Sequence, residues 1–398
     1  MTTPDNPLTA VTHHDPYPYY ARLMEQQPLY RDKELDLWVA SSAKDVAAVL
    51  EHHGCRVRPA NEPVPMALQG TPVGKLFGSL VRMTDGESHC PLKQVVTATL
   101  ATLEEDHITN LSRGCASYLL EEIAPLEPAG LTEFTLRLPA YSVAALLGFQ
   151  SDQWPALARW TGDLARCIAP GATFTQMERG QHAARELQAM TTRLLETQYS
   201  APLSLLTQFT AQARAQGIGS AVIAANVIGF LLQAYDATAG LIGNTLVALG
   251  REPHLPHRVR DEPTLLPAVL REVLRHDAPI QNTRRFVAYD EVIAGQPMQA
   301  GDTILVLLAA ANRDPARHAD PERFDPARQP QHCFTFGLGR HACPGETLAL
   351  AIARAGVAEL LRSGVSLGAL AGEVTYRESL NARIPLFRSS YATPSSTA

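Results

Sequence analysis

The amino-acid sequence predicts a mainly α-helical protein in which a smaller part of the chain forms short strands. Apolar residues recur with helical spacing from about residue 105 to 215, interrupted by prolines. A long apolar stretch from Ile218 to Gly250 contains a single charged residue, Asp236. A further helical pattern follows Gly345. These three observations favour a large helical protein with one central, buried helix.

Composition and charge are those of an ordinary soluble globular protein. The 398 residues are 45% hydrophobic and 19% charged, and the formal net charge is −6. An acidic chain gives no electrostatic reason to expect binding to nucleic acid or to an anionic membrane. Within the apolar stretch, Asn226, Gln233 and Asn244 argue against a membrane span.

Cysteine usage and the N-terminus both favour a cytoplasmic protein. The residues from Met1 to Pro7 lack the basic and apolar regions of a signal peptide. The cysteines are spaced irregularly, which fits reduced thiols better than a disulfide framework. The six of them are Cys55, Cys90, Cys115, Cys167, Cys333 and Cys343.

One cysteine, Cys343, lies in a glycine-rich segment just before an apolar helical pattern. The segment from Phe334 to Gly345 reads FTFGLGRHACPG. A cysteine thiolate is a soft, electron-rich ligand for haem iron, and N–H donors to the sulfur tune its properties. Gly337, Gly339 and Gly345 allow a tight turn and close approach to a flat cofactor. We therefore interpret Cys343 as an axial iron ligand.

Two simpler explanations of Cys343 remain from the residues alone. It can be a buried free cysteine, or a zinc ligand together with Cys333 and His341. A structural zinc site needs four ligands, usually in CxxC-type pairs, and the sequence offers no fourth ligand here.

The spacing Phe-Gly-x-Gly-x-His-x-Cys-x-Gly resembles the haem-binding loop of the cytochromes P450. Four further motifs follow the order of that family between about residues 15 and 388. The resemblance implies the cytochrome P450 fold: a large helical lobe, a smaller β-containing lobe, and haem between the central helix and the cysteine loop. It also implies that Cys343 is the axial thiolate of haem b, that Phe336 and Gly337 lie on the thiolate side, and that His341 meets a haem propionate.

The resemblance implies further partners for the propionates. In the family, a histidine and an arginine four residues later share one propionate from the same helical face. Here these residues are His89 and Lys93, so a point charge replaces a bidentate guanidinium. A later strand motif supplies Arg285, ten residues before Gly295, with Arg284 as the alternative.

The centre of the apolar stretch resembles the family motif Ala-Gly-x-Asp/Glu-Thr-Thr, which lies over the oxygen-binding face of haem. The acid, here Asp236, feeds protons, and the first threonine orients a water. This chain has Ala234 in place of the glycine and Ala237 in place of that threonine. Thr238 follows, about 100° further around a regular helix.

Three routes can replace the missing threonine. Thr238 can act through a locally widened helix, a substrate hydroxyl or ordered water can fill the gap, or the enzyme can use peroxide. An equal alternative is that Thr238 only bonds a backbone carbonyl within the helix.

Two other sets of residues are implied by the resemblance. Glu272 and Arg275, with the later Arg323, resemble the buried triad that supports the haem-binding core and does no chemistry. The substrate pocket is expected to be mostly apolar, which suits a hydrophobic small molecule. Its expected lining is Leu231, Leu232, Tyr235, Ile280, Gln281 and Leu380.

The implied function is a monooxygenase that inserts one oxygen atom of O₂ into a small, mostly hydrophobic substrate by hydroxylation, dealkylation or epoxidation. Because the sequence has no flavin or iron–sulfur motif, electrons are expected from a ferredoxin or flavodoxin-type donor with its NAD(P)H reductase. The Asp-Ala-Thr motif also resembles the haem domain of self-sufficient, reductase-fused P450s. A peroxide-driven peroxygenase and a non-catalytic haem protein that binds a ligand are the alternatives.

The expected organisation is a monomer with one haem domain over residues 1–398. The ends, at residues 1–14 and 389–398, are expected to be flexible.

Overall fold

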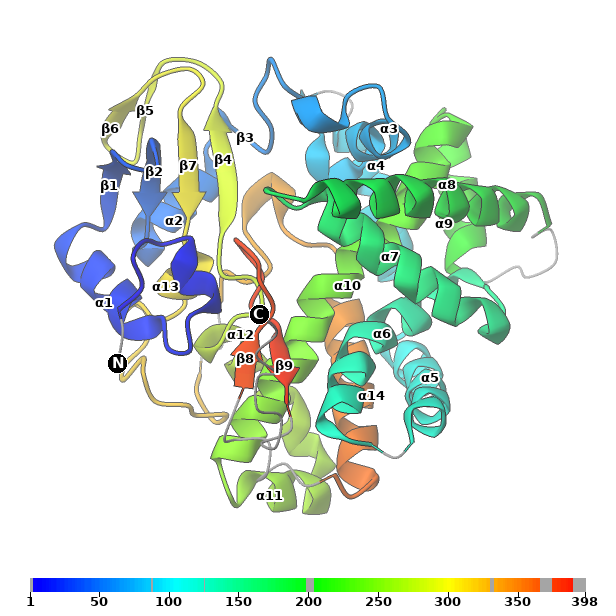
Figure 1. The fold of residues 1–398 in the computed structure, drawn as a ribbon. Coiled ribbons are helices and arrows are strands. Elements are labelled where there is room, and N and C mark those ends of the chain that lie inside the picture. Colours follow the sequence, from blue (N-terminus) through cyan, green and yellow to red (C-terminus); the bar gives the residue numbers. More distant parts are fainter. Residues whose placement is uncertain are drawn as a thin grey trace, which may run out of the picture.

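The computed structural model describes residues 3–86, 89–124, 126–197, 204–329, 333–365 and 374–388. Within these residues the chain forms a smaller lobe with a β-sheet and a larger helical lobe, which lie side by side in Figure 1. The predicted fold class is therefore confirmed.

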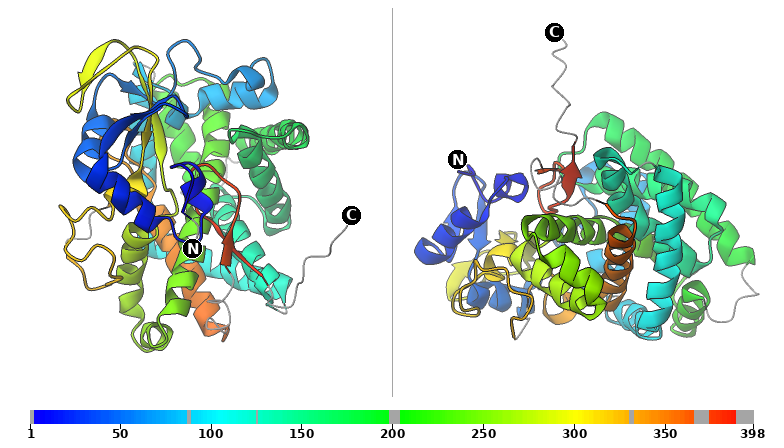
Figure 2. Two further views of the ribbon diagram at one scale, coloured as in Figure 1. Left: turned by 60° about the vertical axis from the view of Figure 1, so that its left-hand side comes forward. Right: turned by 90° about the horizontal axis from the view of Figure 1, so that it is seen from below.

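The smaller lobe is built on a five-stranded sheet with the strand order β1-β2-β7-β4-β3. Strands β2 and β7 run parallel, and the other neighbours are antiparallel. The turned views in Figure 2 show the blue N-terminal strands beside the yellow strands from later in the chain. The strands are β1 (Leu29–Asp32), β2 (Leu37–Ala40), β3 (Cys55–Arg56), β4 (Thr283–Val287) and β7 (Thr303–Val306).

Apolar side chains on both faces of β2 explain why this sheet is covered on both sides. Val39 packs in a cluster with Tyr20 of α1 (Tyr17–Gln26). Ala40 packs in a different cluster, with Val46 of α2 (Ala43–Glu51). A strand that is buried on both faces needs such a near-continuous hydrophobic run. The lobe also contains α13 (Leu308–Ala311) and a hairpin of β5 (Glu291–Ile293) and β6 (Gln296–Met298).

Helix α10 (Ser220–Arg251) is the core of the helical lobe. Among the described elements it packs against α3, α6, α7, α8, α9, α11, α12 and α14. It is long and apolar enough to cross a membrane, but most of its apolar window is buried inside the protein. The prediction of a central buried helix is therefore confirmed.

The other elements of this lobe surround α10. The helices are α3 (Pro72–Ser79), α4 (His89–Ala101), α5 (Glu105–Ile123), α6 (Pro128–Leu147), α7 (Trp154–Ile168), α8 (Phe174–Thr197), α9 (Leu205–Ala215), α11 (Leu255–Asp261), α12 (Leu266–His276) and α14 (Glu346–Arg362). A hairpin of β8 (Val374–Tyr376) and β9 (Pro385–Phe387) lies near α6 and α10.

The described part of the N-terminal segment is folded onto the protein, within the range 1–14 for which a flexible end was predicted. Its short helix η1 (Thr9–Thr12) has buried residues. The buried guanidinium of Arg383 holds the segment because it donates to three of its carbonyl groups, those of Val11, His13 and His14. Residues 1–2 and the predicted flexible end at 389–398 lie outside the described residues.

The buried support triad differs from the prediction in one member. Glu272 and Arg275 form a bidentate pair with N···O distances of 2.9 and 2.7 Å. Arg323 contributes only its backbone carbonyl to Arg275, while its side chain is 70% exposed and pairs with Asp325. The third cation is Arg328, whose Nε lies 3.6 Å from Glu272 Oε1. The prediction for Arg323 is wrong because spacing locates the segment but does not show which side chain turns inward.

Candidate functional site

A tight turn presents Cys343 at the start of α14. The N–H of Cys343 donates to the carbonyl of Phe336 at 2.7 Å. Gly337 and Gly339 have φ values of +71° and +68°, a left-handed conformation that favours glycine. The N–H of Gly345 points at the cysteine sulfur, with an N···S distance of 3.3 Å. An N–H donor to the sulfur, as the glycine-rich sequence predicted, is therefore in place.

The sulfur of Cys343 is accessible but surrounded by protein. The side chain is exposed, yet burial by the surrounding atoms raises the pKa of its thiol, against the Gly345 N–H and the charge of Lys93. Both findings describe a sulfur that borders a space lined by protein atoms. A bound metal ion would remove the thiol proton, because the thiolate is the form that binds metals.

Side chains tie the Cys343 loop to both lobes. The ammonium of Lys93 in α4 donates to the carbonyl of Ala342, next to the cysteine. Thr335 donates to the carbonyl of Leu274 in α12 at 2.7 Å. The sequence analysis missed Arg340, whose Nη2 donates to three carbonyls of the turn after α2, those of His52, His53 and Cys55.

The two histidines predicted to meet haem propionates lie together. The ring centroids of His89 and His341 are 4.4 Å apart. Burial lowers the pKa of His341, and its hydrogen bond to Asp85, with Nε2···Oδ1 at 3.0 Å, only partly offsets this. Burial alone would raise the pKa of Asp85, but hydrogen bonds from His341 and the N–H of Val57 hold it below its usual value. His341 is therefore a neutral donor to a carboxylate.

Two cations near the Cys343 loop, the buried Arg285 and the half-buried Lys93, form no ion pair with a carboxylate among the described residues. Arg285 in β4 is 5% exposed, and its Nε has no hydrogen-bond partner among the described residues. Burial lowers the pKa of Arg285 and also of Lys93. A haem brings two propionates and an iron that takes a thiolate. Its chemistry therefore fits the unpaired Arg285, the cation Lys93 and the sulfur of Cys343.

Donor geometry does not favour the zinc alternative for Cys343. In the part of the chain that the structure describes, one group of three His, Cys, Asp or Glu donors lies within 4.8 Å, and it is His52, His53 and Glu291. Cys333, His341 and Cys343 do not form such a group.

The acid of α10, Asp236, is paired with an arginine that the sequence analysis missed. Arg377 follows β8 and places its Nη2 2.7 Å from Asp236 Oδ2. The other oxygen, Asp236 Oδ1, and Arg377 Nη1 are buried and have no hydrogen-bond partner among the described residues. The pair therefore keeps one acceptor and one donor available.

A second missed cation, Arg82, lies within electrostatic range of both Asp236 and Cys343. Its short helix η3 (Val81–Met83) is fixed to α10 because the N–H of Val81 donates to Asn226 Oδ1 at 3.0 Å. The side chain of Arg82 is exposed, but the surrounding protein lowers its pKa by burial. Like Cys343, Arg82 borders a space lined by protein.

The surroundings of Thr238 and Ala237 bear on the routes predicted to replace the missing threonine in proton delivery. Thr238 is 1% exposed, and its Oγ1 has no hydrogen-bond partner in the described structure. Bonding to a helix carbonyl, one of the alternatives, is therefore not observed. Helix α10 is α-helical without interruption across the motif, so the local widening is absent as well. Ala237 is half-buried and offers no hydroxyl.

The residues predicted to line the pocket are all buried or half-buried. Gln281 is fully buried, and its amide donates to the carbonyl of Ala278 at 2.7 Å, so it serves packing within the smaller lobe. Burial raises the pKa of Tyr235 to about 12. The apolar members are Leu231, Leu232, Ile280 and Leu380.

Comparison with known proteins places this site in a family. The profile of the family "Cytochrome P450" matches residues 175–363. The putative cytochrome P450 133B2 of Xylella fastidiosa is 29% identical over 300 residues, 74% of each chain. The 6-deoxyerythronolide B hydroxylase of Saccharopolyspora erythraea is 27% identical over 397 residues, 96% of each chain. The crystal structure of CalO2 matches with a TM-score of 0.82 at 26% identity and covers 97% of each chain.

The matches to the hydroxylase and to CalO2 extend over almost the whole chain, and the family profile includes the loop around Cys343. The Saccharopolyspora relative is named as a hydroxylase, and the fold of CalO2 is shared over 97% of each chain. We conclude that this chain belongs to the cytochrome P450 superfamily and is a monooxygenase of the bacterial type.

Proposed function

We propose that the protein is a haem-thiolate monooxygenase that inserts one oxygen atom of O₂ into a small, mostly hydrophobic substrate by hydroxylation, dealkylation or epoxidation. The observation that supports this best is the placement of Cys343. Its sulfur accepts a hydrogen bond from the N–H of Gly345 and borders a space lined by protein atoms. Arg82 lies within electrostatic range of both this sulfur and Asp236.

Haem b would be held by Cys343 and by groups around its edge. With an axial thiolate, bound haem supplies the activation of O₂. The N–H of Gly345 would moderate the electron density on the sulfur. Lys93 and Arg285 would place positive charges next to the negatively charged propionates. His89 and His341 would lie at the haem edge beside a propionate, and Phe336 and Gly337 would cover the thiolate side.

Asp236 is the residue to which we assign proton delivery. Arg377 fixes one of its oxygens, and the second oxygen is buried without a partner among the described residues. A carboxylate held in this way can position a water and pass a proton through its free oxygen. Because Ala237 has no hydroxyl, the path is completed by Thr238 Oγ1, ordered water or a substrate hydroxyl.

The charges near Asp236 suggest a substrate class. Arg82 and Arg377 bring two positive charges, and Asp236 brings one negative charge. The other proposed lining residues are mostly apolar. A hydrophobic molecule with one carboxylate would balance the charge, so we infer that acids bind more tightly than their methyl esters.

The haem absorption shift on ligand binding tests this inference with matched acids and esters. We expect acids to bind at least about tenfold more tightly, which is about 1.4 kcal/mol, and Arg377→Gln to reduce this preference. If Arg82 serves a propionate instead, Arg82→Gln would lose haem on dialysis while the preference stayed unchanged. Equal affinities of acids and esters would contradict the inference.

We propose the electron donor, the cellular location and the oligomeric state from the sequence analysis. Electrons would come from a ferredoxin or flavodoxin-type protein with its NAD(P)H reductase. The protein would be a cytoplasmic monomer in which residues 1–398 form one haem domain. Reconstitution with a surrogate ferredoxin and reductase tests the electron source.

The decisive experiment combines a spectrum with turnover. Reduced protein under carbon monoxide should absorb near about 450 nm if a thiolate binds the haem iron. Product formation with NADPH, reductase and ferredoxin would support the monooxygenase. Equal or faster turnover with hydrogen peroxide alone would favour the peroxygenase, and normal haem and ligand binding with no turnover would favour a binding protein. A band near about 420 nm in fresh protein would contradict thiolate ligation.

A further inference from the structure

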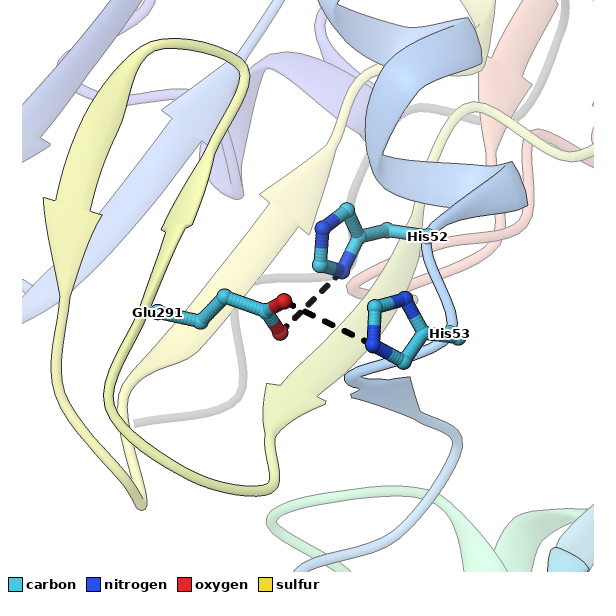
Figure 3. Close-up of side chains that lie close together, drawn as sticks. All are labelled: His52, His53 and Glu291. Carbon is cyan, nitrogen blue, oxygen red and sulfur yellow. Dashed lines mark ion pairs between the residues drawn. The ribbon is translucent and has the colours of Figure 1, made fainter.

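Two histidines and a glutamate meet in the smaller lobe, away from the residues assigned to haem. Figure 3 shows His52 and His53, just after α2, directed toward Glu291 at the start of β5. His52 Nδ1 lies 3.8 Å from Glu291 Oε2, and His53 Nε2 lies 3.5 Å from Glu291 Oε1. One donor atom of each residue lies within 4.8 Å of the other two.

The absence of a side chain at Gly54 leaves room for the carboxylate of Glu291. A Cβ at Gly54 would lie 2.6 Å from Glu291 Oε2, so a residue with a side chain there would push the carboxylate away. The N–H of Gly54 donates to His52 Nδ1 at 3.2 Å. The lone pair of Nδ1 accepts this N–H, so the proton of a neutral His52 is on Nε2, and a metal ion bound at Nδ1 would replace the hydrogen bond from Gly54.

One atom of the cluster has no partner to explain it. Glu291 Oε2 is buried and makes no hydrogen bond within the described residues. A buried carboxylate oxygen is normally satisfied by a donor, a cation or water. His52 Nδ1 lies 3.8 Å from this oxygen, too far for a hydrogen bond.

The spacing of the donors is close to that of a metal site. Ligands at about 2.0–2.1 Å in a tetrahedral zinc site lie about 3.3 Å from one another. The two histidine–glutamate separations, 3.5 Å to Oε1 and 3.8 Å to Oε2, exceed this value by about 0.5 Å or less and end at different oxygens of the carboxylate. His53 is free to make the larger adjustment because its side chain is 71% exposed. That exposure also leaves room for a water as fourth ligand.

We propose that His52, His53 and Glu291 form a binding site for a borderline divalent transition-metal ion such as Zn²⁺. Two imidazoles and one carboxylate suit zinc, nickel, cobalt or copper, whereas magnesium and calcium prefer oxygen ligands alone. The site connects the β5–β6 hairpin to the turn whose carbonyls bind Arg340. A bound ion would therefore link this hairpin to the support of the cysteine loop.

Calorimetric titration of the haem-loaded protein, freed of metal by a chelator, with zinc chloride tests the proposal. We expect one zinc ion to bind, and Glu291→Gln and His53→Gln each to weaken binding by at least about tenfold. The matched control is His182→Gln, because His182 forms an exposed pair with Glu186 at 4.0 Å but has no third donor among the described residues. It should leave binding unchanged.

Thermal unfolding provides a second readout that does not depend on calorimetry. A ligand that binds only the folded state raises the melting temperature, so zinc should stabilise the wild type and not Glu291→Gln. Circular dichroism without zinc checks that each variant is folded, and the haem spectrum should be the same in all of them. The proposal would be overturned if the wild type bound no zinc. It would also be overturned if Glu291→Gln bound zinc as tightly as the wild type.

Discussion

The loop around Cys343, called the paired side below, and the α10 side of the proposed haem space differ in how completely their polar groups are paired. On the side of Cys343, the loop is held by its own N–H groups and by bonds from Lys93 and Arg340. On the side of α10, three buried polar atoms have no hydrogen-bond partner among the described residues: Asp236 Oδ1, Thr238 Oγ1 and Arg377 Nη1.

This difference separates a scaffold from a reaction space. Buried polar groups are normally hydrogen-bonded, so a cluster of unpaired ones indicates where bound molecules complete the bonds. Because the hydrogen bonds of the Cys343 loop are formed within the protein, the sulfur is positioned before the haem binds, as a preorganised site requires. The departures at Ala234 and Ala237 from the family motif lie on the unpaired side, where substrate and water can take over a missing group.

Replacing the ligand on the paired side should have the largest effect. In Cys343→His, an imidazole takes the place of the electron-donating thiolate. We expect the carbon monoxide band to move from about 450 to about 420 nm and product formation to fall below detection. The control is Cys333→Ser, which changes another cysteine of the same segment and should preserve both. A band that stays near about 450 nm in Cys343→His would show that another residue supplies the thiolate.

On the unpaired side, Asp236→Asn should slow turnover by about 10²- to 10⁴-fold, because positioned proton transfer contributes that much. Substrate binding should be retained, and more reducing equivalents should end as hydrogen peroxide. Arg377→Gln should give a smaller loss, since Asp236 stays ionisable but is no longer fixed. Product and peroxide yields per NADPH measure both. Unchanged turnover in Asp236→Asn would move proton delivery to another group.

The sequence predicted the paired side better than the unpaired side, and the reason is physical. Cys343 and its glycines act within a short segment, so their spacing alone carries the geometry. Asp236 was recognised, but its partner Arg377 comes from a hairpin far along the chain, and no local pattern connects the two. Arg82 was missed for the same reason.

The support triad shows the limit of motif spacing. The sequence located Glu272 and Arg275 correctly because they share one helical face. It named Arg323 and did not consider Arg328, because only packing decides which guanidinium is buried. The helical fold class followed from periodicity, whereas the division into a large helical lobe and a smaller β-containing lobe came only from the family resemblance.

The support triad beneath the paired side should respond in a graded way. Glu272→Gln should destabilise the protein by about 3–5 kcal/mol, because it leaves Arg275 buried without its partner. Arg328→Gln should cost about 1–3 kcal/mol. Arg323→Gln should stay within about 0.5 kcal/mol, as an exposed side chain does. Urea denaturation measures all three, and a larger loss for Arg323→Gln than for Arg328→Gln would restore the predicted triad.

An effect that appears only at acid pH should come from His276, at the end of α12. Burial, with the charge of Arg313, lowers its pKa from 6.5 to about 3. Below pH 6.5 the unfolded chain therefore binds a proton that the folded protein does not. Stability contributed by neutral His276 is fully present above pH 6.5 and is lost as the pH falls toward 3.

His276→Gln isolates this contribution. His276 Nε2 lies 3.0 Å from the carbonyl of Glu322, and glutamine can donate to the same carbonyl without titrating. Between pH 6.5 and 4, the wild type should lose up to about 1.4 kcal/mol of stability per pH unit more than the variant, the slope for one proton. Other carboxylates titrate equally in both proteins, so the difference between their denaturation curves reports His276 alone. Parallel curves would mean that His276 becomes protonated within the folded protein, and that this end of α12 is open to water.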